Sequence, residues 1–374
     1  MDSHAEGPRP LDWTNILFLT LTPVLGVPVL IWHTLHVGFE PWMAVLFLGM
    51  YALVGLSVCA GYHRYFSHKS YECSRGVQLF YALFGAMAAQ NSILRWSAGH
   101  RKHHSCSDSD WDPYSIQRGF WWAHVLWVFR KNPDYQRGSV KDLESNPVVM
   151  WQHRWYRTVL IVGGFGLPLA IGAVMGDWMA GLLWGGFLRI VVVHHSTFLV
   201  NSLAHYFGRR TYDGDASARD NWAVALLTFG EGYHSFHHKF PSDFRNGVRW
   251  YAWDPAKWFI AVLKLCGMAW NLREMAAPVI ESARVKAAAR VLEERVAATP
   301  ASQRYLSELR ARLQDVRKKF EDAFELWRQQ ASERRLGQSY RATYDRYRAQ
   351  LRQAREEWRR TLQWIKSLRM FETA

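Results

Sequence analysis

Histidines gather at a few short sites along this 374-residue chain. Two clusters repeat the pattern His-x-x-His-His, and a third site has two histidines five residues apart. One further histidine stands alone between the two clusters. These nine residues are His63, His68, His100, His103, His104, His205, His234, His237 and His238. Neutral imidazole offers a nitrogen lone pair near neutral pH, which makes histidine the commonest metal ligand among side chains. The pattern therefore predicts a metal centre.

The number of these histidines predicts more than one metal ion. Three or four protein ligands satisfy a zinc ion, so nine imidazoles exceed a single tetrahedral site. Within each His-x-x-His-His cluster the histidines lie three and four residues apart, which puts them on one face of a helix. An imidazole-rich site suits iron, copper, nickel or zinc, and the spacing leaves all four open. The remaining histidines lack such partners, although a helper role stays open for two of them, His194 and His195.

Long apolar segments must position the clusters. Four apolar runs cover residues 15–32, 42–61, 158–176 and 178–200. Each is near the ~20 residues that cross a bilayer core as a helix. Very short connections join the first run to the second and the third to the fourth, so we expect two helical hairpins through the membrane. Both connections lack Lys and Arg, whereas the others are basic. The positive-inside rule then places both termini and all nine histidines on the cytoplasmic side.

The predicted fold is an all-α integral membrane protein. It has four transmembrane helices in two hairpins, a cytoplasmic histidine-rich helical cap and a C-terminal helical hairpin. Two shorter apolar segments, residues 77–89 and 120–129, are expected to be helices at the membrane interface. Packing beneath the cap is the alternative for both. Arg189 is the one charge inside a span, and we expect it to snorkel or to pair with the cap.

The last hundred residues differ in character from the rest. Residues 281–374 hold 22 Lys and Arg against 13 Asp and Glu, a large part of the chain's net charge of +14. Apolar residues there recur three and four apart, which predicts helices. We therefore expect two domains: residues 1–275 in the membrane, and a basic, coiled-coil-like helical tail at 276–374. We expect this tail to self-associate or to bind a partner, and we expect no nucleic acid. The four cysteines form no Cys-x-x-Cys pair, which argues against a disulfide scaffold or zinc ribbon.

Several motifs resemble the membrane-bound acyl-CoA desaturases of the stearoyl-CoA delta-9 type. Besides the histidines, these motifs include Asp110-Trp-Asp-Pro, Gln117-Arg-Gly-Phe and Gly230-Glu-Gly-Tyr. The resemblance covers about residues 11–272. It implies that the nine histidines bind two iron ions, with Asn201 holding one iron through a water molecule. It implies no catalytic residue beyond this di-iron centre.

The resemblance also implies a reaction. Molecular oxygen, two electrons and two protons would be used to introduce a cis double bond, at the delta-9 position, into a saturated acyl chain. An unactivated methylene has no acidic hydrogen, so an oxidising metal centre must act on it. The implied substrate is acyl-CoA. Because Ala98-Gly99 stands where the family has Arg-Asp, acyl carrier protein or a phospholipid acyl chain remains an alternative carrier. A ferredoxin or small cytochrome with its reductase would supply the electrons.

Successive methylenes are chemically alike, so a tunnel that measures the chain must select the bond. By resemblance, three residues lie near the bend of this tunnel: Gln90, Trp96 and Thr197. Gly55 bears on the depth of the tunnel. Three others meet the polar head of the carrier: Asn91, Arg130 and Lys131. The alternatives are a related di-iron lipid or alkane hydroxylase, or a histidine-rich metal transporter. Transporters usually place their ligands near the bilayer midplane, where these spans have almost no polar side chains that could bind an ion. We expect a multi-pass protein of a bacterial inner membrane.

Overall fold

A computed structural model describes residues 9–131, 139–298, 305–336 and 339–367. They form two compact units. The first holds the described residues of Met1–Gly208 and Ser217–Glu274, and the second holds Arg209–Ala216 with those of Met275–Ala374. The described structure is mostly helical. Its one small sheet pairs strand β1, Glu72–Cys73, antiparallel with strand β2, Ala269–Trp270.

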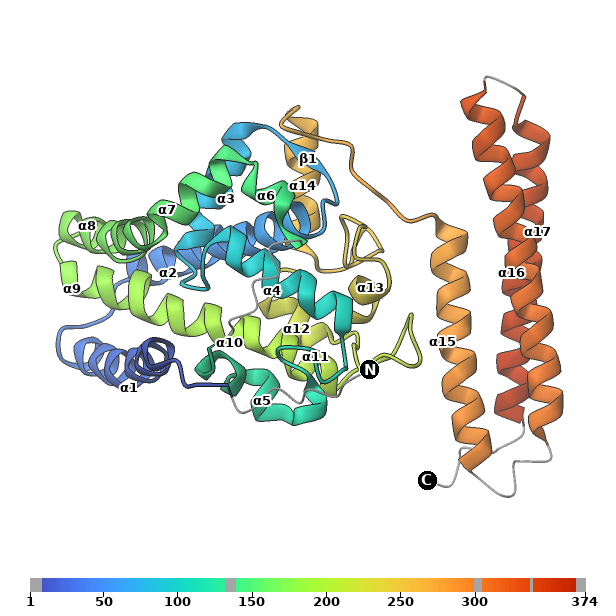
Figure 1. The fold of residues 1–374 in the computed structure, drawn as a ribbon, viewed down its shortest axis with the longest axis horizontal. Coiled ribbons are helices and arrows are strands. Elements are labelled where there is room, and N and C mark those ends of the chain that lie inside the picture. The colour runs from blue at the N-terminus through green and yellow to red at the C-terminus, as the bar shows by residue number, and fades with distance from the viewer. Residues whose placement is uncertain (1–8, 132–138, 299–304, 337–338, 368–374) are drawn as a thin grey trace. The chain divides into compact units, whose positions relative to one another are not determined.

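Four helices among the described residues are long and apolar enough to cross a bilayer, which confirms the four predicted spans. Some of them contain π-helical stretches, η1, η5 and η6. In chain order the spans are α1 Trp13–His36; α2 Pro41–Leu56 with η1 Ser57–Ser67; α7 Pro147–Ile161 with η5 Val162–Gly166 and α8 Leu167–Val174; and α9 Trp178–Gly181 with η6 Leu182–Leu188, α10 Arg189–Asn201 and α11 Leu203–Tyr206. They lie side by side in Figure 1 and pack on one another.

Local sequence fixes where the spans begin. Pro41 opens α2 at a position where its missing N–H is not needed, and Asn146 caps α7. Asp177 caps α9 by accepting a hydrogen bond from a backbone N–H at 2.9 Å. Its other carboxylate oxygen lies 2.9 Å from the Nε2 atom of buried His33 on α1. The acidic residue of the second tight turn therefore ties the two hairpins together at one end.

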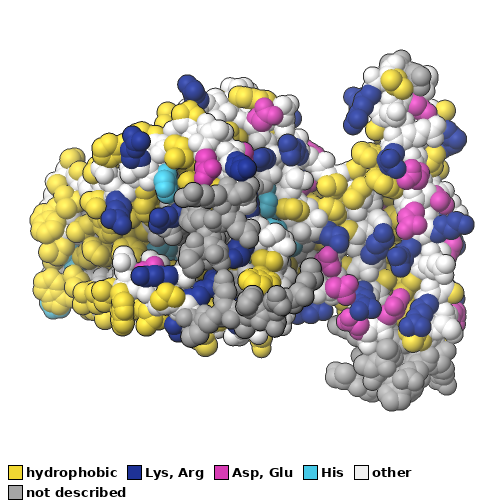
Figure 2. Space-filling model, in the orientation of Figure 1, with side chains coloured by type: hydrophobic (Ala, Val, Ile, Leu, Met, Phe, Trp, Pro, Cys, Tyr) yellow, Lys and Arg dark blue, Asp and Glu magenta, His cyan; other side chains and the backbone are white. Residues whose placement is uncertain are grey.

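The outer surfaces of the spans carry large apolar side chains that water would not favour. Examples are Leu17, Leu21, Val24, Leu25, Ile31, Leu35, Val45, Leu48, Ile161, Val162 and Val174. On the face drawn in Figure 2, hydrophobic side chains gather over α1, α8 and α9. Exposed apolar patches of this extent mark a membrane or partner surface, and these patches lie on helices long and apolar enough to cross a membrane.

The remaining elements of the first unit form the cap. They are α3 Arg75–Ala86, α4 Ile93–Cys106, η2 Ile116–Arg118, α5 Phe120–His124, η3 Leu126–Phe129, α6 Lys141–Glu144, α12 Trp222–Leu227, α13 His234–Lys239 and α14 Pro255–Leu265. Helix α3 packs against η1 and α7 with Val77 and Tyr81 buried, so packing rather than the interface governs its inner face. The expected single helix at 120–129 is instead two short helices that meet at Val125, where α5 ends.

Arg189 is buried in the fourth span and does not snorkel. Its guanidinium donates hydrogen bonds to three backbone carbonyls, those of Gly185 at 2.9 Å, Gly164 at 2.8 Å and Met87. Met87 follows the last residue of α3, and Gly164 lies in η5. Carbonyls at a helix end or a π-helical turn lack ordinary helical partners and cannot find water in a bilayer. Arg189 therefore meets the cap through the carbonyl of Met87 and satisfies two further carbonyls within the spans.

The second unit is a bundle of three helices, α15 Ala277–Ala298, α16 Leu306–Arg335 and α17 Arg341–Ser367. The expected hairpin corresponds to α16 and α17, and α15 is an addition that packs on α16. One shared core holds all three helices together: Val285, Val316, Phe320, Ala323, Leu351 and Ala354. The hairpin alone was predicted because its apolar spacing is strong, whereas α15 is largely Ala and Arg. Two punctuating residues of the prediction, Pro300 and Gly337, lie outside the described residues.

A short segment from the middle of the chain belongs to this second unit. Residues 209–216 lie between the fourth span and α12 in sequence, yet they cluster with α15. Nε of Arg290 lies 3.1 Å from a carboxylate oxygen of Asp215, and a Cβ at Gly214 would meet the Arg290 side chain. This association was not predictable, because the segment has no periodic pattern.

Candidate metal centre

A π-helical turn at the end of the second span positions the first two histidines. The backbone N–H of His68 donates to the carbonyl of His63, five residues earlier, at 3.2 Å. Five residues of an ordinary α-helix would carry the two side chains to different faces. The wider turn keeps them on one face, with ring centroids 5.0 Å apart. Such π-helical turns recur at functional sites.

Helices of the cap supply six of the other histidines, and the end of the fourth span supplies the seventh. Their placement has local causes. Ser92 caps α4 by accepting from a backbone N–H at 3.4 Å. Arg101 holds the same helix against the end of η1, because its guanidinium donates to the carbonyls of Ser67 at 3.0 Å and Phe66 at 2.7 Å. Gly230 adopts a positive φ of 103° ahead of the short helix α13, a conformation that glycine allows without strain. Helix α4 carries three of the nine histidines, α13 three and α11 one.

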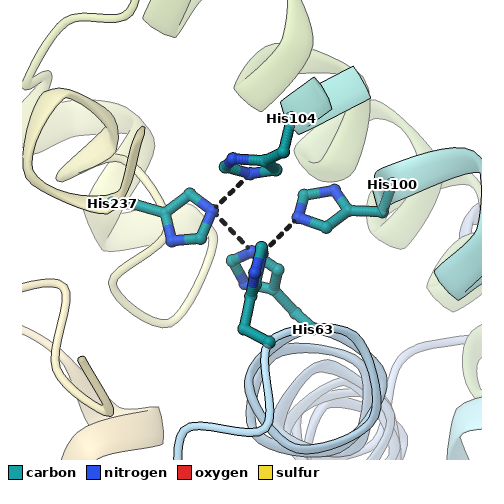
Figure 3. A group of neighbouring side chains, drawn as sticks. His63, His100, His104 and His237 are labelled. Carbon is teal, nitrogen blue, oxygen red and sulfur yellow. Dashed lines mark hydrogen bonds between the residues drawn. The ribbon is translucent and has the colours of Figure 1, made fainter. Parts of the chain in front are cut away.

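The nine imidazoles converge in two groups. The five-histidine group is His63, His68, His100, His104 and His237; the four-histidine group is His103, His205, His234 and His238. Within each group, one ring nitrogen of every residue lies within 4.8 Å of those of the others. Figure 3 shows rings of the first group pointing at one another across a common centre.

The closest approaches in both groups join Nε2 atoms. They are His63 to His237 at 3.0 Å, His68 to His100 at 2.8 Å, His104 to His237 at 2.8 Å, His103 to His238 at 3.2 Å, His205 to His234 at 2.9 Å and His234 to His238 at 3.0 Å. Two metal–nitrogen bonds of ~2.1 Å at a right angle hold their nitrogens about 3.0 Å apart. The separations therefore match those of ligands that share an ion.

The opposite ring nitrogens show which way the lone pairs point. Nδ1 of His63 lies 2.5 Å from a carboxylate oxygen of Glu231, and Nδ1 of His103 lies 2.9 Å from Asp112. An imidazole that donates from Nδ1 to a carboxylate keeps its lone pair on Nε2, as metal-bound histidines do. Lone pairs converging on the same points repel unless a cation lies between them. The residues present thus fit a metal ion in each group.

Burial keeps six of the nine imidazoles neutral. It holds the pKa of His100, His104 and His237 well below the usual value for histidine, and the neighbouring imidazoles lower it further. The same causes lower the pKa of three more ligand candidates: His68, His234 and His238. Neutral rings at pH 7 have free lone pairs, which a metal ion requires.

A buried ionic network stands behind the five-histidine group. Nη2 of Arg64 lies 2.9 Å from a carboxylate oxygen of Glu231 and 2.9 Å from one of Asp254. Asn246 donates to Glu231 at 2.9 Å. Burial alone would raise the pKa of Glu231, but His63 and Arg64 outweigh it and lower that pKa. The carboxylate therefore stays charged and holds the His63 ring. The motif Gly230-Glu-Gly-Tyr contains Glu231, but nothing in its residue types or spacing indicates this role.

A cavity with mostly apolar walls adjoins both groups. Its lining includes His63, His100, His103 and His234, together with residues of α2, α10 and α12. Gly55 and Tyr51 line it two and three turns before His63 on the same helix. A Cβ at Gly55 would clash with the ring of Phe229, so the two residues touch at that depth. Apolar pockets with a few convergent polar groups are typical ligand sites.

Several residues predicted to contact substrate lie together at this cavity. Gly55, Trp96 and Thr197 line it, and so does Asn201, which was predicted to hold an iron through a water molecule. Gln90 lies behind them, where it donates to the Thr197 hydroxyl at 2.8 Å and accepts from the Trp96 indole at 3.2 Å. This chain of hydrogen bonds fixes the Trp96 ring, which stacks on His100 with centroids 5.0 Å apart.

The residues predicted to meet the carrier head do not line the cavity. The backbone N–H of Asn91 donates to the Tyr156 hydroxyl at 3.0 Å. Arg130 donates to the carbonyl of Arg9 at 3.0 Å, and the backbone of Lys131 donates to that of Pro10 at 2.9 Å. The contacts of Arg130 and Lys131 hold the segment that leads into α1, whereas that of Asn91 joins the loop before α4 to α7.

The two histidines left open as helpers belong to neither group. The side chain of His194 approaches the carbonyl of Ala89 at 3.3 Å. Nδ1 of His195 lies 3.2 Å from Nε2 of His124, whose Nδ1 lies 2.9 Å from the Ser202 hydroxyl. These contacts tie α10 to α5 and to the segment before α4, which is a packing role.

Comparison with known proteins identifies the family. The family model for fatty acid desaturases matches residues 40–263, which include all nine histidines. Over 282 residues the chain is 39% identical to acyl-CoA desaturase 1 of Saccharomyces cerevisiae, covering 74% of this chain and 54% of that protein. It thus spans about half the length of the yeast relative.

Two further relatives are matched over most of their length. An sn-2 palmitoyl-lipid 9-desaturase of a Nostoc species is 37% identical over 267 residues, which cover 69% of this chain and 89% of that protein. Human stearoyl-CoA desaturase is 35% identical over 300 residues, 75% of this chain and 80% of that protein. Desaturases of this family use iron, and the two histidine groups supply ligands suited to it. The chain described here is a member of the fatty acid desaturase family.

Proposed function

We propose that this protein is an oxygen-dependent di-iron desaturase that introduces a cis double bond, at the delta-9 position, into a saturated acyl chain. One –CH2–CH2– unit, O2, two protons and two electrons would give one –CH=CH– unit and two molecules of water. The product would enter the synthesis of unsaturated fatty acids. One observation carries the proposal: two groups of converging Nε2 atoms adjoin a cavity with apolar walls.

Each part of the site has a task in this reaction. The nine histidines would hold two irons, and Asn201 on the cavity wall would hold one of them through a water molecule. When bound, the irons would supply the oxygen chemistry that removes hydrogen from an unactivated methylene. Glu231 and Asp112 fix the rings of His63 and His103. The apolar cavity walls would exclude water and position the chain, so that one bond lies next to the ligands.

The proposed reaction implies an acyl carrier and an electron donor. We take acyl-CoA as the substrate because the yeast and human relatives are named for it, and a lipid-linked chain as the competing carrier because of the Nostoc relative. Two electrons must come from outside, from a ferredoxin or small cytochrome with its reductase. The basic connections support a cytoplasmic active site, with both termini on that side of a bacterial inner membrane.

The test is turnover with defined components. The purified full-length chain, loaded with iron, would receive stearoyl-CoA, O2, and a ferredoxin with its reductase and NADPH. Gas chromatography of the products should show a cis-9 monoene that requires both O2 and reductant. A hydroxylated acyl chain as the main product would instead identify a hydroxylase. Metal uptake by proteoliposomes without product would identify a transporter. Phospholipids bearing stearoyl chains, offered in parallel, would distinguish the two carriers.

A further inference from the structure

We propose that Asp108 and Ser217 act together as a positioning pair for His205, and that they set the affinity of the four-histidine group for its metal ion. The inference rests on the metal centre of the proposed function and assigns roles to two residues outside the nine candidate ligands. Neither residue carries a recognisable local motif. Asp108 follows α4, and Ser217 lies in the loop before α12.

The three side chains form one hydrogen-bonded chain. Nδ1 of His205 lies 2.6 Å from the Ser217 hydroxyl oxygen. The Ser217 hydroxyl donates to one carboxylate oxygen of Asp108, and the Ser217 backbone N–H donates to the other at 2.9 Å. A serine hydroxyl has a single hydrogen. Since Asp108 takes it, the serine oxygen must accept from the N–H at Nδ1 of His205.

This direction fixes the state of His205. With Nδ1 protonated, the lone pair of the neutral ring stands on Nε2, which faces Nε2 of His234 at 2.9 Å. The charge on Asp108 thus reaches the ligand nitrogen through the serine hydroxyl, and the ring cannot turn without breaking a 2.6 Å hydrogen bond. Ligand histidines are oriented by such partners of the second ring nitrogen.

The backbone of Asp108 is itself shaped for this contact. Its φ of 65° lies in the left-handed region, which aspartate adopts only uncommonly. Its backbone N–H donates to Asp112 at 3.3 Å, and Asp112 also binds Nδ1 of His103. One short loop therefore presents two carboxylates to the four-histidine group, one to His103 directly and one to His205 through Ser217. Strained backbone of this kind persists where the surroundings hold it and often marks a functional site.

The effect should fall on one metal ion rather than on both. His205 belongs to the four-histidine group, whereas the five-histidine group has its own carboxylate, Glu231, on His63. Loss of a residue that orients a ligand typically lowers metal affinity by about 10- to 100-fold. A role confined to holding the loop would behave differently. It would lower the melting temperature of the metal-free protein and would not need the hydroxyl of residue 217.

The experiment is a Co²⁺ titration of the full-length, metal-free protein in detergent, followed by the visible absorption of the bound ion and by metal analysis. Four variants accompany the wild type: Ser217→Ala, Ser217→Thr, Asp108→Asn and the control Asp110→Asn. Asp110 is exposed and lies two residues from Asp108. Thermal melting of each metal-free variant reports on folding.

Wild type and Asp110→Asn should bind two ions. Ser217→Ala and Asp108→Asn should bind one ion with unchanged affinity and the second about 10- to 100-fold more weakly. Ser217→Thr, which keeps the hydroxyl, should recover most of the loss. All metal-free variants should have the melting temperature of the metal-free wild type.

Two results would overturn the inference while the proposed function stands. One is wild-type affinity for both ions in Ser217→Ala and Asp108→Asn. The other is an equal loss of affinity for both ions in these variants, together with a lower melting temperature that Ser217→Thr does not restore. A wild-type chain that binds no pair of ions would overturn the proposed function, and this inference with it. The measurement does not depend on turnover, so the failures are distinguishable.

Discussion

A histidine becomes a good metal ligand through the partner of its other ring nitrogen. In this protein carboxylates hold His63 and His103 directly, and a serine relays a third carboxylate to His205. The nine histidines themselves were predictable because their short, repeated spacing is legible in sequence. Their orienting residues were not, since contacts such as that of Ser217 with Asp108 join positions 109 residues apart. No local period records a contact of that kind.

The replacement His103→Ala tests the site at this scale. It removes one of four imidazoles and leaves Asp112 without its partner. Because removal of an orienting residue already costs about 10- to 100-fold, loss of the ligand should exceed about 100-fold in affinity for one ion and abolish turnover. Iron analysis and the desaturation assay provide the measurements. His36→Ala is the control, because His36 is exposed and belongs to neither histidine group. Full activity of His103→Ala would contradict the assignment.

At the scale of elements, the four spans were predictable from apolar length alone, because a bilayer demands about 20 apolar residues per helix. The π-helical end of the second span was not. Nothing in the residue types of 57–67 distinguishes a wide helical turn from an ordinary one, and packing of η1 on α3 and α4 decides it. The break at Val125 and the third helix of the tail were not predicted for the same reason, because both depend on tertiary contacts.

The replacement Gly55→Phe tests how α2 limits the cavity. A side chain at Gly55 meets the Phe229 ring, so a phenyl group there should shorten the space available to an acyl chain. We expect activity to shift from stearoyl toward shorter substrates such as myristoyl-CoA, as measured by gas chromatography of competing substrates. Gly49→Phe on the same helix is the matched control, since nothing lies within 4 Å of a Cβ at Gly49. An unchanged preference in Gly55→Phe would refute this role.

The whole molecule consists of two units with unequal chemistry. All nine candidate ligands lie in the first unit, and the second is a helical bundle with its own apolar core. Two of the bundle's helices, α16 and α17, were predictable from their spacing, whereas α15 was not. The association of residues 209–216 with the bundle was not predictable either, because a short irregular segment can pack anywhere its ends allow. Metal should therefore support the folding of one unit only.

Metal removal tests this division. An ion that binds only the folded state stabilises it by about 2.7 kcal/mol per site at a free concentration one hundred times its Kd. Chelation should therefore lower the melting temperature of the first unit, and that of the bundle should not change. Differential scanning calorimetry of the full chain with metal, with chelator, and with chelator followed by excess Fe²⁺ provides the measurement. A matching fall in both transitions would show that the bundle also depends on the metal.

The neighbourhood of Phe229 has a practical consequence for redesign. Phe229 sits against Gly55 with a backbone φ of 53°, and only Gly230 separates it from Glu231, the carboxylate behind His63. Phe229 and Glu231 thus line the cavity, and Glu231 also holds the ring of His63, a candidate metal ligand. We expect a change at Phe229, made to accept a new chain length, to disturb this ring as well. Changes made from α2, at Gly55, leave that loop sequence intact and are the safer place to alter selectivity.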